Sequence, residues 1–575
     1  MRTANPAPPR PGEDEPDPPG ARPAPPAPRA AEPRWTGPGR ATAAAVLVPA
    51  LTMLGLGLWG LDRGTLWRDE AASFQAARRT LPELAHLLGG IDAVHGLYYL
   101  LLHAVLSFRA DEVALRLPSV LAAACTAGLV GALGARLARP RVGLWAGLLY
   151  AATPFASHYA QEGRSYALVA AAAAAATLCL VRAVERGSAR RWAAYAAATV
   201  LTALLHELAL LLLAAHALTL LACRARLPER TGRRWGAAAG ATLAAVLPLV
   251  LLSHRQEGQI SWIETPGRGQ ALALLRDFAG PSGLVLAVNL ALIAVALLGA
   301  WDGGTSGDGG SGAGRMAGGG AHGGACGVAC GGAHGGAYGG AAGSGRSGRP
   351  LTPVAVALPL ATAGPALLFA AARWEPLFVD RYVLFALAGV PLLAATGAEC
   401  LVRRLRLPSV PVALAGALAV AAAFGWQLPL HERERRPVSR QDDLAAVAHL
   451  VRERTKPGDA LLFVPSAQRR IALAYPRAFT GRRDLALERP VAASGTLDGR
   501  EVPPRELRAR LAGTERVWVV AEPGVVNRAW FRRNTREQSK LAALHADFTT
   551  FSTAQSRSGT ITLLVRGTRV QGGRS

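Results

Sequence analysis

An apolar stretch and the polar residues after it decide the fold: Ala41 to Leu61 (ATAAAVLVPALTMLGLGLWGL), then Leu66-Trp67-Arg68-Asp69-Glu70. The apolar stretch is long enough to cross a bilayer, which takes about 20 residues. Two adjacent acids therefore lie at a membrane boundary, where carboxylates are costly unless they are solvated, paired or used for function. Asp69 and Glu70 belong either to an ordinary polar loop or to a functional site.

Composition extends the membrane interpretation to the whole chain. Of its 575 residues, 51% are hydrophobic, and many apolar runs reach the ~18 residues of a membrane span. The net charge of +24 does not indicate nucleic acid, because much of the arginine lies in short loops between spans, where it sets orientation. The sequence predicts an all-α polytopic membrane bundle of about 11–13 transmembrane helices in the cell membrane.

The apolar runs give the approximate order of the spans. The run 193–222 is too long for one crossing, since it would extend for ~45 Å as a helix. His206-Glu207 at its middle therefore indicates two short spans with a turn between them. His95–Phe108 is so short that it is expected to be re-entrant or interfacial. After Ala41–Leu61, further spans are predicted at 115–135, 141–157, 165–183, 191–205, 207–223, 235–253, 281–301, 351–372, 381–401 and 408–427.

Arginine-rich loops orient these spans. Cytoplasmic loops carry an excess of Lys and Arg, which places 136–141, 182–191, 223–234 and 402–406 in the cytoplasm. Loops 62–94, 158–164, 254–280 and 373–380 then face outward, provided that His95–Phe108 does not cross. This gives about eleven crossings with a cytoplasmic N-terminus and an extracytoplasmic C-terminus. Ala71–Leu88 has apolar residues at near-helical spacing and is predicted to be one helix on the membrane surface.

The remaining segments divide the chain into five parts. Residues 1–40 are expected to be a disordered cytoplasmic tail, and 302–349 a Gly-rich flexible loop between transmembrane parts 41–301 and 350–427. In that loop His322, Cys326, Cys330 and His334 are spaced four residues apart. They could bind zinc, but a slipped GGAHGGAC-like repeat is the favoured explanation, because no ordered flanking sequence positions the ligands.

Residues 428–575 are predicted to fold as a C-terminal extracytoplasmic α/β domain. Leu444–Arg454 has helical periodicity, and three apolar β-rich runs are typical of strands: Ala460–Val464, Arg516–Val520 and Thr560–Val565. About 145 residues are enough for a small domain. The domain contains no cysteine, so we expect no disulfide framework in it.

The chemically interesting residues gather in the loops predicted to face outward. Each has a structural alternative, because polar residues at span ends also form solvated ion pairs, helix caps and interface anchors. Their sequence stretches are Asp69-Glu70, His95 to Tyr99 (HGLYY), Tyr159 to Tyr166 (YAQEGRSY), His206-Glu207 and Asp380-Arg381-Tyr382.

The order and spacing of these stretches resemble the C-type (GT-C) glycosyltransferases, in particular the protein O-mannosyltransferase and lipid A aminoarabinose transferase superfamily. The resemblance covers roughly residues 41–427. It is carried by the acids after the first span, His95 and Leu97-Tyr98-Tyr99, Leu115-Arg116-Leu117-Pro118, Gln161-Glu162 with Arg164 and Tyr166-Ala167-Leu168, and Asp380-Arg381-Tyr382. Gly96 departs from the pattern, which commonly has Pro there.

The resemblance implies transfer of a sugar, most commonly mannose, from a polyprenyl-phosphate carrier to a hydroxyl acceptor outside the cytoplasm. The acceptor would be a protein, a glycolipid or a wall polymer. In such enzymes the acid after the first span is the catalytic base, which here is Asp69, with Glu70 orienting the base or the acceptor. The implied donor-phosphate ligands are Arg381, Arg164 and Arg116, and the implied substrate-binding residues are His95, Tyr98, Gln161, Glu162, His206 and Tyr382.

Two questions stay open at the level of sequence. A polytopic transporter or lipid flippase would also need charged residues near its spans, although transporters usually contain internal repeats around midplane sites, and we find no repeat. No cofactor is required by the sequence, but a divalent cation near Asp69 and Glu70 is possible, since carboxylates bind such ions.

Overall fold

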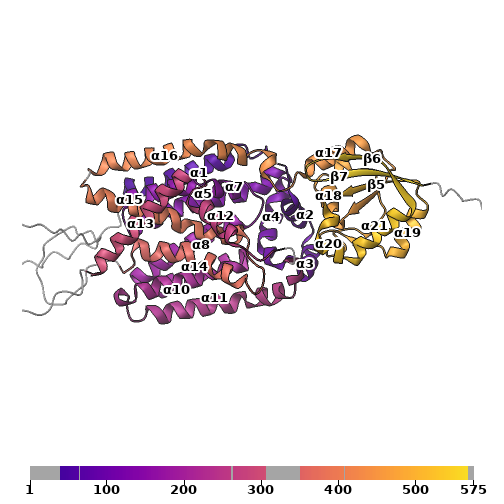
Figure 1. Ribbon diagram of the computed structural model, residues 1–575. Helices are drawn as coiled ribbons and strands as arrows, with labels where there is room; N and C mark the ends of the chain where they lie inside the picture. Colours follow the sequence, from indigo (N-terminus) through magenta and orange to yellow (C-terminus); the bar gives the residue numbers. More distant parts are fainter. Residues whose placement is uncertain (1–38, 64, 261–262, 306–349, 407, 568–575) are drawn as a thin grey trace, which may run out of the picture. The chain divides into compact units, whose positions relative to one another are not determined.

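The computed structural model describes residues 39–63, 65–260, 263–305, 350–406 and 408–567. The tail predicted for residues 1–40 lies almost wholly outside these ranges, as do the cysteines and histidines of the predicted Gly-rich loop. Residues from Arg40 onward form one compact unit, and Figure 1 labels many of its helices and strands.

The membrane part is a bundle of apolar helices. Eight described helical segments, including the joined segment Asp380–Arg404, are long and apolar enough to span a bilayer. As predicted, the run around His206 breaks into two helices, α9 and α10, joined by a short 3-10 turn. The bundle helices are α1 (Arg40–Leu58), α5 (Glu112–Leu137), α6 (Pro140–Ala151), α8 (Tyr166–Arg186), α9 (Ala189–Leu205), α10 (Leu211–Ala222), α11 (Thr231–His254), α13 (Gly283–Thr305), α14 (Pro353–Ala371), α15 (Gly389–Arg404) and α16 (Ser409–Glu434).

Short helices lie at one end of this bundle. The segment Ala71–Leu88 is two helices rather than the predicted single one, because the chain leaves helical geometry at Arg78 and Thr80 caps a new helix with Glu83. These short helices are α2 (Arg68–Ala77), α3 (Leu81–Gly90), α4 (Gly96–Phe108), α7 (Pro154–Ala160) and α12 (Arg268–Ala279). We call this the α2 end of the bundle.

The opposite end is rich in arginine. Arg136 pairs with Glu185, and Glu399 is surrounded by Arg139, Arg141 and Arg403. These contacts bring loops 136–141, 182–191 and 402–406 together at one end of the bundle, whereas the cytoplasmic location predicted for them and for 223–234 stays a prediction. We call this the arginine end.

Helix α4 does not cross between the two ends. It follows His95, which contacts Arg164 at the α2 end, and it leads to Glu112, whose carboxylate accepts a hydrogen bond from Tyr475 of the C-terminal domain (2.7 Å). Both termini of this 13-residue helix therefore lie at the same end. Eight of the eleven bundle helices named above coincide with described segments that are long and apolar enough to span a bilayer, so the count of about eleven crossings stays a prediction.

The C-terminal domain is a mixed sheet with helices on both faces. Strands β1 (Ala460–Val464) and β5 (Arg516–Ala521) are buried, and their side chains alternate between the two faces, as a period of two requires. Leu462 and Val519 face α19 (Pro504–Ala512) and α21 (Thr535–Asp547), whereas Phe463 and Trp518 face α17 (Leu444–Arg454) and α18 (Arg469–Ala474).

The sheet has the order β2-β1-β5-β7-β6, with β1 parallel to β2 and β5 and the other pairs antiparallel. The predicted helix and three strands are confirmed within one residue. The elements are α17 (Leu444–Arg454), β1 (Ala460–Val464), α18 (Arg469–Ala474), β2 (Arg483–Asp484), β3 (Leu487–Arg489), β4 (Arg500–Glu501), α19 (Pro504–Ala512), β5 (Arg516–Ala521), α20 (Ala529–Arg533), α21 (Thr535–Asp547), β6 (Phe548–Gln555) and β7 (Thr560–Arg566).

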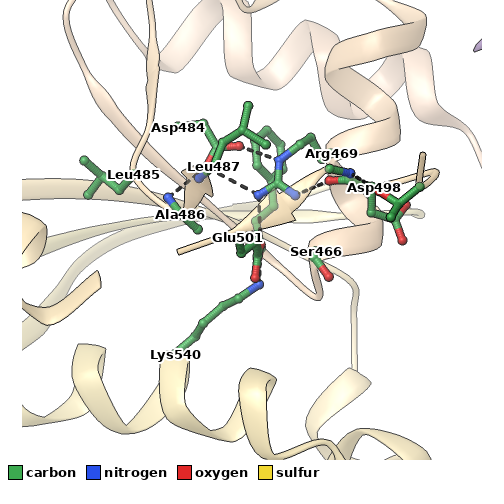
Figure 2. A network of polar contacts seen from close by, with 12 residues as sticks. Ser466, Arg469, Asp484, Leu485, Ala486, Leu487, Asp498, Glu501 and Lys540 are labelled. Atoms are coloured by element: carbon green, nitrogen blue, oxygen red, sulfur yellow. Dashed lines mark hydrogen bonds and ion pairs between the residues drawn. The ribbon is translucent and has the colours of Figure 1, made fainter. Parts of the chain in front are cut away.

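A buried charge network ties these elements together (Figure 2). Arg469 pairs with Asp484 and with Glu501 (2.8 Å to the latter), and Lys540 reaches Glu501 (2.8 Å) and Glu537 (3.1 Å). The Lys540 and Glu501 side chains are each 2% exposed. Buried charges are tolerated only when they are paired, so this network fixes α18, β2, β4 and α21 relative to one another.

Candidate active site

Three consecutive residues at the start of α2 have three different partners. Arg68 pairs with Asp442 of the C-terminal domain, Asp69 lies beside Arg381, and Glu70 pairs with Arg116. Consecutive residues of an α-helix project about 100° apart, so three side chains of one turn can contact three different parts of the protein. Asp69 and Glu70 are thus separated by the geometry of the helix, although they are adjacent in sequence.

Glu70 is enclosed by hydrogen-bond donors. Its two carboxylate oxygens each accept a hydrogen bond of 2.8 Å from Arg116, and Oε1 also accepts one from the backbone N–H of Gly163 (2.8 Å). The other Arg116 donors reach the carbonyls of Leu61 (3.3 Å) and Thr65 (2.9 Å). Burial disfavours the charged form of Glu70, but Arg116 outweighs it and holds the pKa of this carboxyl below its usual value.

Asp69 has a more open surrounding. Its side chain is 27% exposed, and Oδ2 lies 3.7 Å from Nη2 of Arg381. Arg381 donates to the hydroxyl of Tyr166 (3.2 Å), and Arg164 donates to the hydroxyl of Ser73 (3.0 Å). Both guanidinium groups are buried, so two positive charges lie in a low-dielectric wall next to a reachable carboxylate.

These groups line a cavity of about 1460 Å³ between the α2 end of the bundle and the C-terminal domain. The volume is large enough for a sugar together with its leaving group, since ligand pockets are typically ~300–1,000 Å³. Of the predicted site residues, the cavity wall contains Asp69, His95, Arg164, His206, Arg381 and Tyr382.

Aromatic and imidazole rings form the part of the wall around these arginines. His95 lies 2.6 Å from Arg164, and the ring of His206 is centred 4.7 Å from that of Tyr382. Tyr166, which carries part of the resemblance, lies against both His206 and Tyr382. The side chains of His95 and His206 are almost wholly buried.

The other predicted substrate-binding residues lie behind this wall. Tyr98 is fully buried in the hydrophobic cluster of α2, α3 and α4. Gln161 donates to the carbonyls of Gly57 (3.0 Å) and Trp59 (2.8 Å), which end helix α1. Glu162 is buried and lies 3.6 Å from His158. Like Glu70 and Arg116, these three residues are absent from the cavity wall formed by the described residues.

Comparison with known proteins agrees with this geometry. Residues 96–254 match the family described as Dolichyl-phosphate-mannose-protein mannosyltransferase. Two crystal structures of ArnT from Cupriavidus metallidurans have a similar fold: the one bound to undecaprenyl phosphate gives a TM-score of 0.54 at 12% identity, covering 90% of this chain and 97% of ArnT. The apo form gives 0.53 at 12% identity, covering 91% and 98%. No curated protein sequence matches. Residues 96–254 are thus similar to that mannosyltransferase family, and the chain as a whole shares the fold of ArnT.

The GT-C resemblance did not identify the wall that the C-terminal domain contributes. Asp442, Arg470, Arg528, Arg532 and Arg533 line the cavity opposite the bundle. The sequence carries no motif for them, because they come from separate helices and loops of an arginine-rich domain. One signal was available: Arg68 is charged and directly adjacent to the acid expected at the site, and a charged neighbour there needs a partner.

The acids of this site are not arranged as a metal-binding cluster in the described part of the chain. No described group of three or more His, Cys, Asp or Glu side chains could hold a metal ion. Glu70, which the sequence suggests as a cation ligand together with Asp69, is bound by Arg116.

Proposed function

We propose that this protein transfers a sugar from a polyprenyl-phosphate carrier to a hydroxyl acceptor, with Asp69 as the catalytic base. The observation that carries the proposal is the joint presence, on one cavity wall, of a partly exposed carboxylate and two buried guanidinium groups, Arg381 and Arg164. A carboxylate accepts a proton, and buried arginines bind phosphate. Both are needed when an alcohol displaces a lipid phosphate.

The reaction we propose is a single displacement with inversion. The Asp69 carboxylate takes the proton of the acceptor hydroxyl while the oxygen of that hydroxyl forms a bond to the anomeric carbon. The bond from that carbon to the phosphate oxygen breaks, and its electrons leave with the polyprenyl phosphate. Arg381 and Arg164 stabilise the developing charge on the phosphate.

The distance between Asp69 and Arg381 suits this division of roles. At 3.7 Å the contact is longer than the ~2.7–2.9 Å of a charge-assisted hydrogen bond. A donor phosphate could therefore make a stronger contact with Arg381 than Asp69 does, leaving the Asp69 carboxylate to the acceptor.

We assign the remaining predicted residues by their position. His95, His206 and Tyr382, together with Tyr166, form the surface for the sugar. Glu70 and Arg116 hold helix α2, and Gln161, Glu162 and Tyr98 support the wall from behind. Arg116 is therefore proposed as a positioning residue and not as a phosphate ligand, because Glu70 and two backbone carbonyls engage its donors.

We propose mannose as the sugar, since the matched family is described by that substrate, and a protein, glycolipid or wall polymer as the acceptor. The carrier is proposed because one ArnT structure of similar fold is described as bound to undecaprenyl phosphate. Following the arginine bias of the loops, the arginine end and the N-terminus would be cytoplasmic and the cavity extracytoplasmic.

The direct test is turnover of polyprenyl-phosphate mannose by the purified protein in lipid, with envelope fractions as acceptor. The expected result is free polyprenyl phosphate together with a mannosylated product that Asp69→Asn does not form. Movement of the lipid-linked sugar between leaflets without any product would instead favour a flippase. Turnover with a different lipid-linked sugar would retain the mechanism and change the substrate.

A further inference from the structure

We propose that Arg68 is a positioning residue, through which Asp442 and Glu522 of the C-terminal domain hold Asp69 at the cavity. The inference deepens the proposed function and rests on it for its kinetic consequences. It gives the C-terminal domain a part in the chemical step, in addition to its part of the cavity wall.

The Arg68 guanidinium bridges two carboxylates of the C-terminal domain. Nε lies 3.3 Å from Oδ2 of Asp442, and Nη2 lies 3.4 Å from Oδ1 of Asp442 and 3.3 Å from Oε1 of Glu522. The backbone N–H of Arg68 also donates to Asp442 (3.3 Å). The carboxylate side chains are only 15% and 7% exposed, so solvent screens these contacts less than those of a surface pair.

The residues on either side of Arg68 contact the same domain. The backbone N–H of Leu66 donates to the Tyr475 hydroxyl (3.1 Å), and the carbonyl of Leu66 accepts a hydrogen bond from the backbone N–H of Leu444 (3.3 Å). Ala71 packs in the apolar cluster of α17 and α18. The first turn of α2 is therefore docked on the C-terminal domain through its backbone as well as through its charges.

The opposite side of the same turn is attached to the bundle by Glu70 and Arg116. Asp69 lies between the two attachments, and within the described ranges its carboxylate has one ion-pair contact, at 3.7 Å from Arg381. Its position is therefore set by Arg68 on one side and by Glu70 on the other. A displacement of ~1 Å at a reacting group can cost about a hundredfold in rate.

The C-terminal domain can act as a rigid support. Asp442 lies just before α17, and Glu522 directly follows β5, the strand that pairs with β1 at the centre of the sheet. The network in Figure 2 fixes the end of β1 through Lys540, which donates to the Phe463 carbonyl (3.1 Å). Glu522 also pairs with Arg528 of the cavity wall (3.2 Å).

The kinetic test removes the two carboxylate charges while keeping their shape. We expect Asp442→Asn with Glu522→Gln to lower kcat by about 10- to 100-fold, with the KM for the lipid-linked sugar changed less than about twofold. Arg68→Ala should do the same, and Arg68→Lys should restore part of the rate. In the Arg68→Ala background the two carboxylate changes should add little, because their effect passes through Arg68. Glu506→Gln, which removes a carboxylate paired with Arg510 on α19, is the matched control.

A second readout does not depend on activity. Hydrogen exchange of the α2 backbone, residues 68–77, should accelerate in the Asp442→Asn/Glu522→Gln variant and not in Glu506→Gln. Two results for the Asp442→Asn/Glu522→Gln variant would overturn the inference. One is an unchanged kcat with a raised KM for the acceptor, and the other is unchanged hydrogen exchange in α2. If the parent transfers no sugar, the proposed function fails, and the exchange measurement alone still decides whether Arg68 positions α2.

Discussion

The two sides of helix α2 place chemically similar carboxylates in opposite surroundings. On the bundle side, Glu70 is fully buried and accepts three hydrogen bonds of 2.8 Å. On the cavity side, Asp69 is 27% exposed and has an ion-pair contact of 3.7 Å. A carboxylate whose oxygens are all engaged can hold a structure but cannot reach a substrate, whereas a loosely held carboxylate in a cavity can.

This difference gives a rule for assigning the other charged residues. Arg116 and Arg381 lie within one helical turn of the bundle's α2 end, yet Arg116 is enclosed by Glu70 and carbonyls while Arg381 faces the cavity. We therefore expect changes on the bundle side to alter stability and changes on the cavity side to alter turnover.

The largest effect should come from Asp69→Asn. Loss of a general base typically costs ~10²–10⁴-fold in rate, and the amide keeps the shape of the side chain, so the melting temperature should hardly change. Turnover of the lipid-linked sugar and a thermal melt in the same lipid would measure both. A folded variant with parental turnover would remove Asp69 from the chemistry and with it the contrast between the two sides of α2.

Glu70→Gln should show the reverse pattern. Breaking a buried ion pair by removing one partner typically destabilises a protein by ~3–5 kcal/mol, since the Arg116 charge stays buried without its partner. We expect a large fall in melting temperature, with kcat per folded molecule reduced less than in Asp69→Asn. Glu506→Gln, which breaks an exposed pair with Arg510 on α19, is the control. A stable Glu70→Gln variant with lost turnover would make Glu70 a catalytic residue.

Much of the fold could be predicted from sequence because hydrophobic length and period are local properties. The break at His206 followed from the length of the run, and Ala460–Val464 and Arg516–Val520 from their short apolar, β-rich pattern. The break between α2 and α3 was missed because apolar spacing continues through Arg78 to Thr80, and the spacing does not reveal that Thr80 caps a new helix.

The site could be predicted only in part. The order of motifs identified the residues that meet at the α2 end, but it could not separate the cavity wall from the layer behind it. Gln161 and Arg164 are three residues apart, yet Gln161 donates a hydrogen bond to the last turn of helix α1, whereas Arg164 faces the cavity. That distinction depends on which way the 158–164 loop turns. The roles of Asp442 and Glu522 depend on their contacts with Arg68, which lies more than 370 residues earlier in the chain.

Arg381→Ala should give the next smaller effect. A charge-assisted arginine–phosphate contact is worth ~1.5–3 kcal/mol, so we expect donor use to weaken by about 10- to 150-fold, at 1.4 kcal/mol per decade. Arg381→Lys should recover only part of it, since lysine lacks the bidentate fork. The measurement is the dependence of turnover on the lipid-linked sugar, with Arg276→Ala, at the end of α12, as control. An unchanged donor dependence would shift the phosphate site to Arg164.

The smallest effect concerns Glu162, on the bundle side of this division, and its partner His158. Burial lowers the pKa of His158, but the nearby Glu162 carboxylate (3.6 Å) and a hydrogen bond with Glu434 outweigh burial and raise this pKa to about 9. A folded-state pKa raised above the usual 6.5 means that the pair stabilises the protein fully below pH 6.5 and loses this contribution as the pH rises through about 9. The effect should be modest, because the His158 side chain is 24% exposed.

Melting temperatures measured from pH 6 to pH 9.5 should therefore fall more steeply for the parent than for His158→Gln. The control is His449→Gln, at an exposed pair on α17, which should keep the parental slope. If Glu162→Gln leaves this slope intact but lowers kcat, Glu162 acts on the substrate and belongs with Asp69 rather than with Glu70.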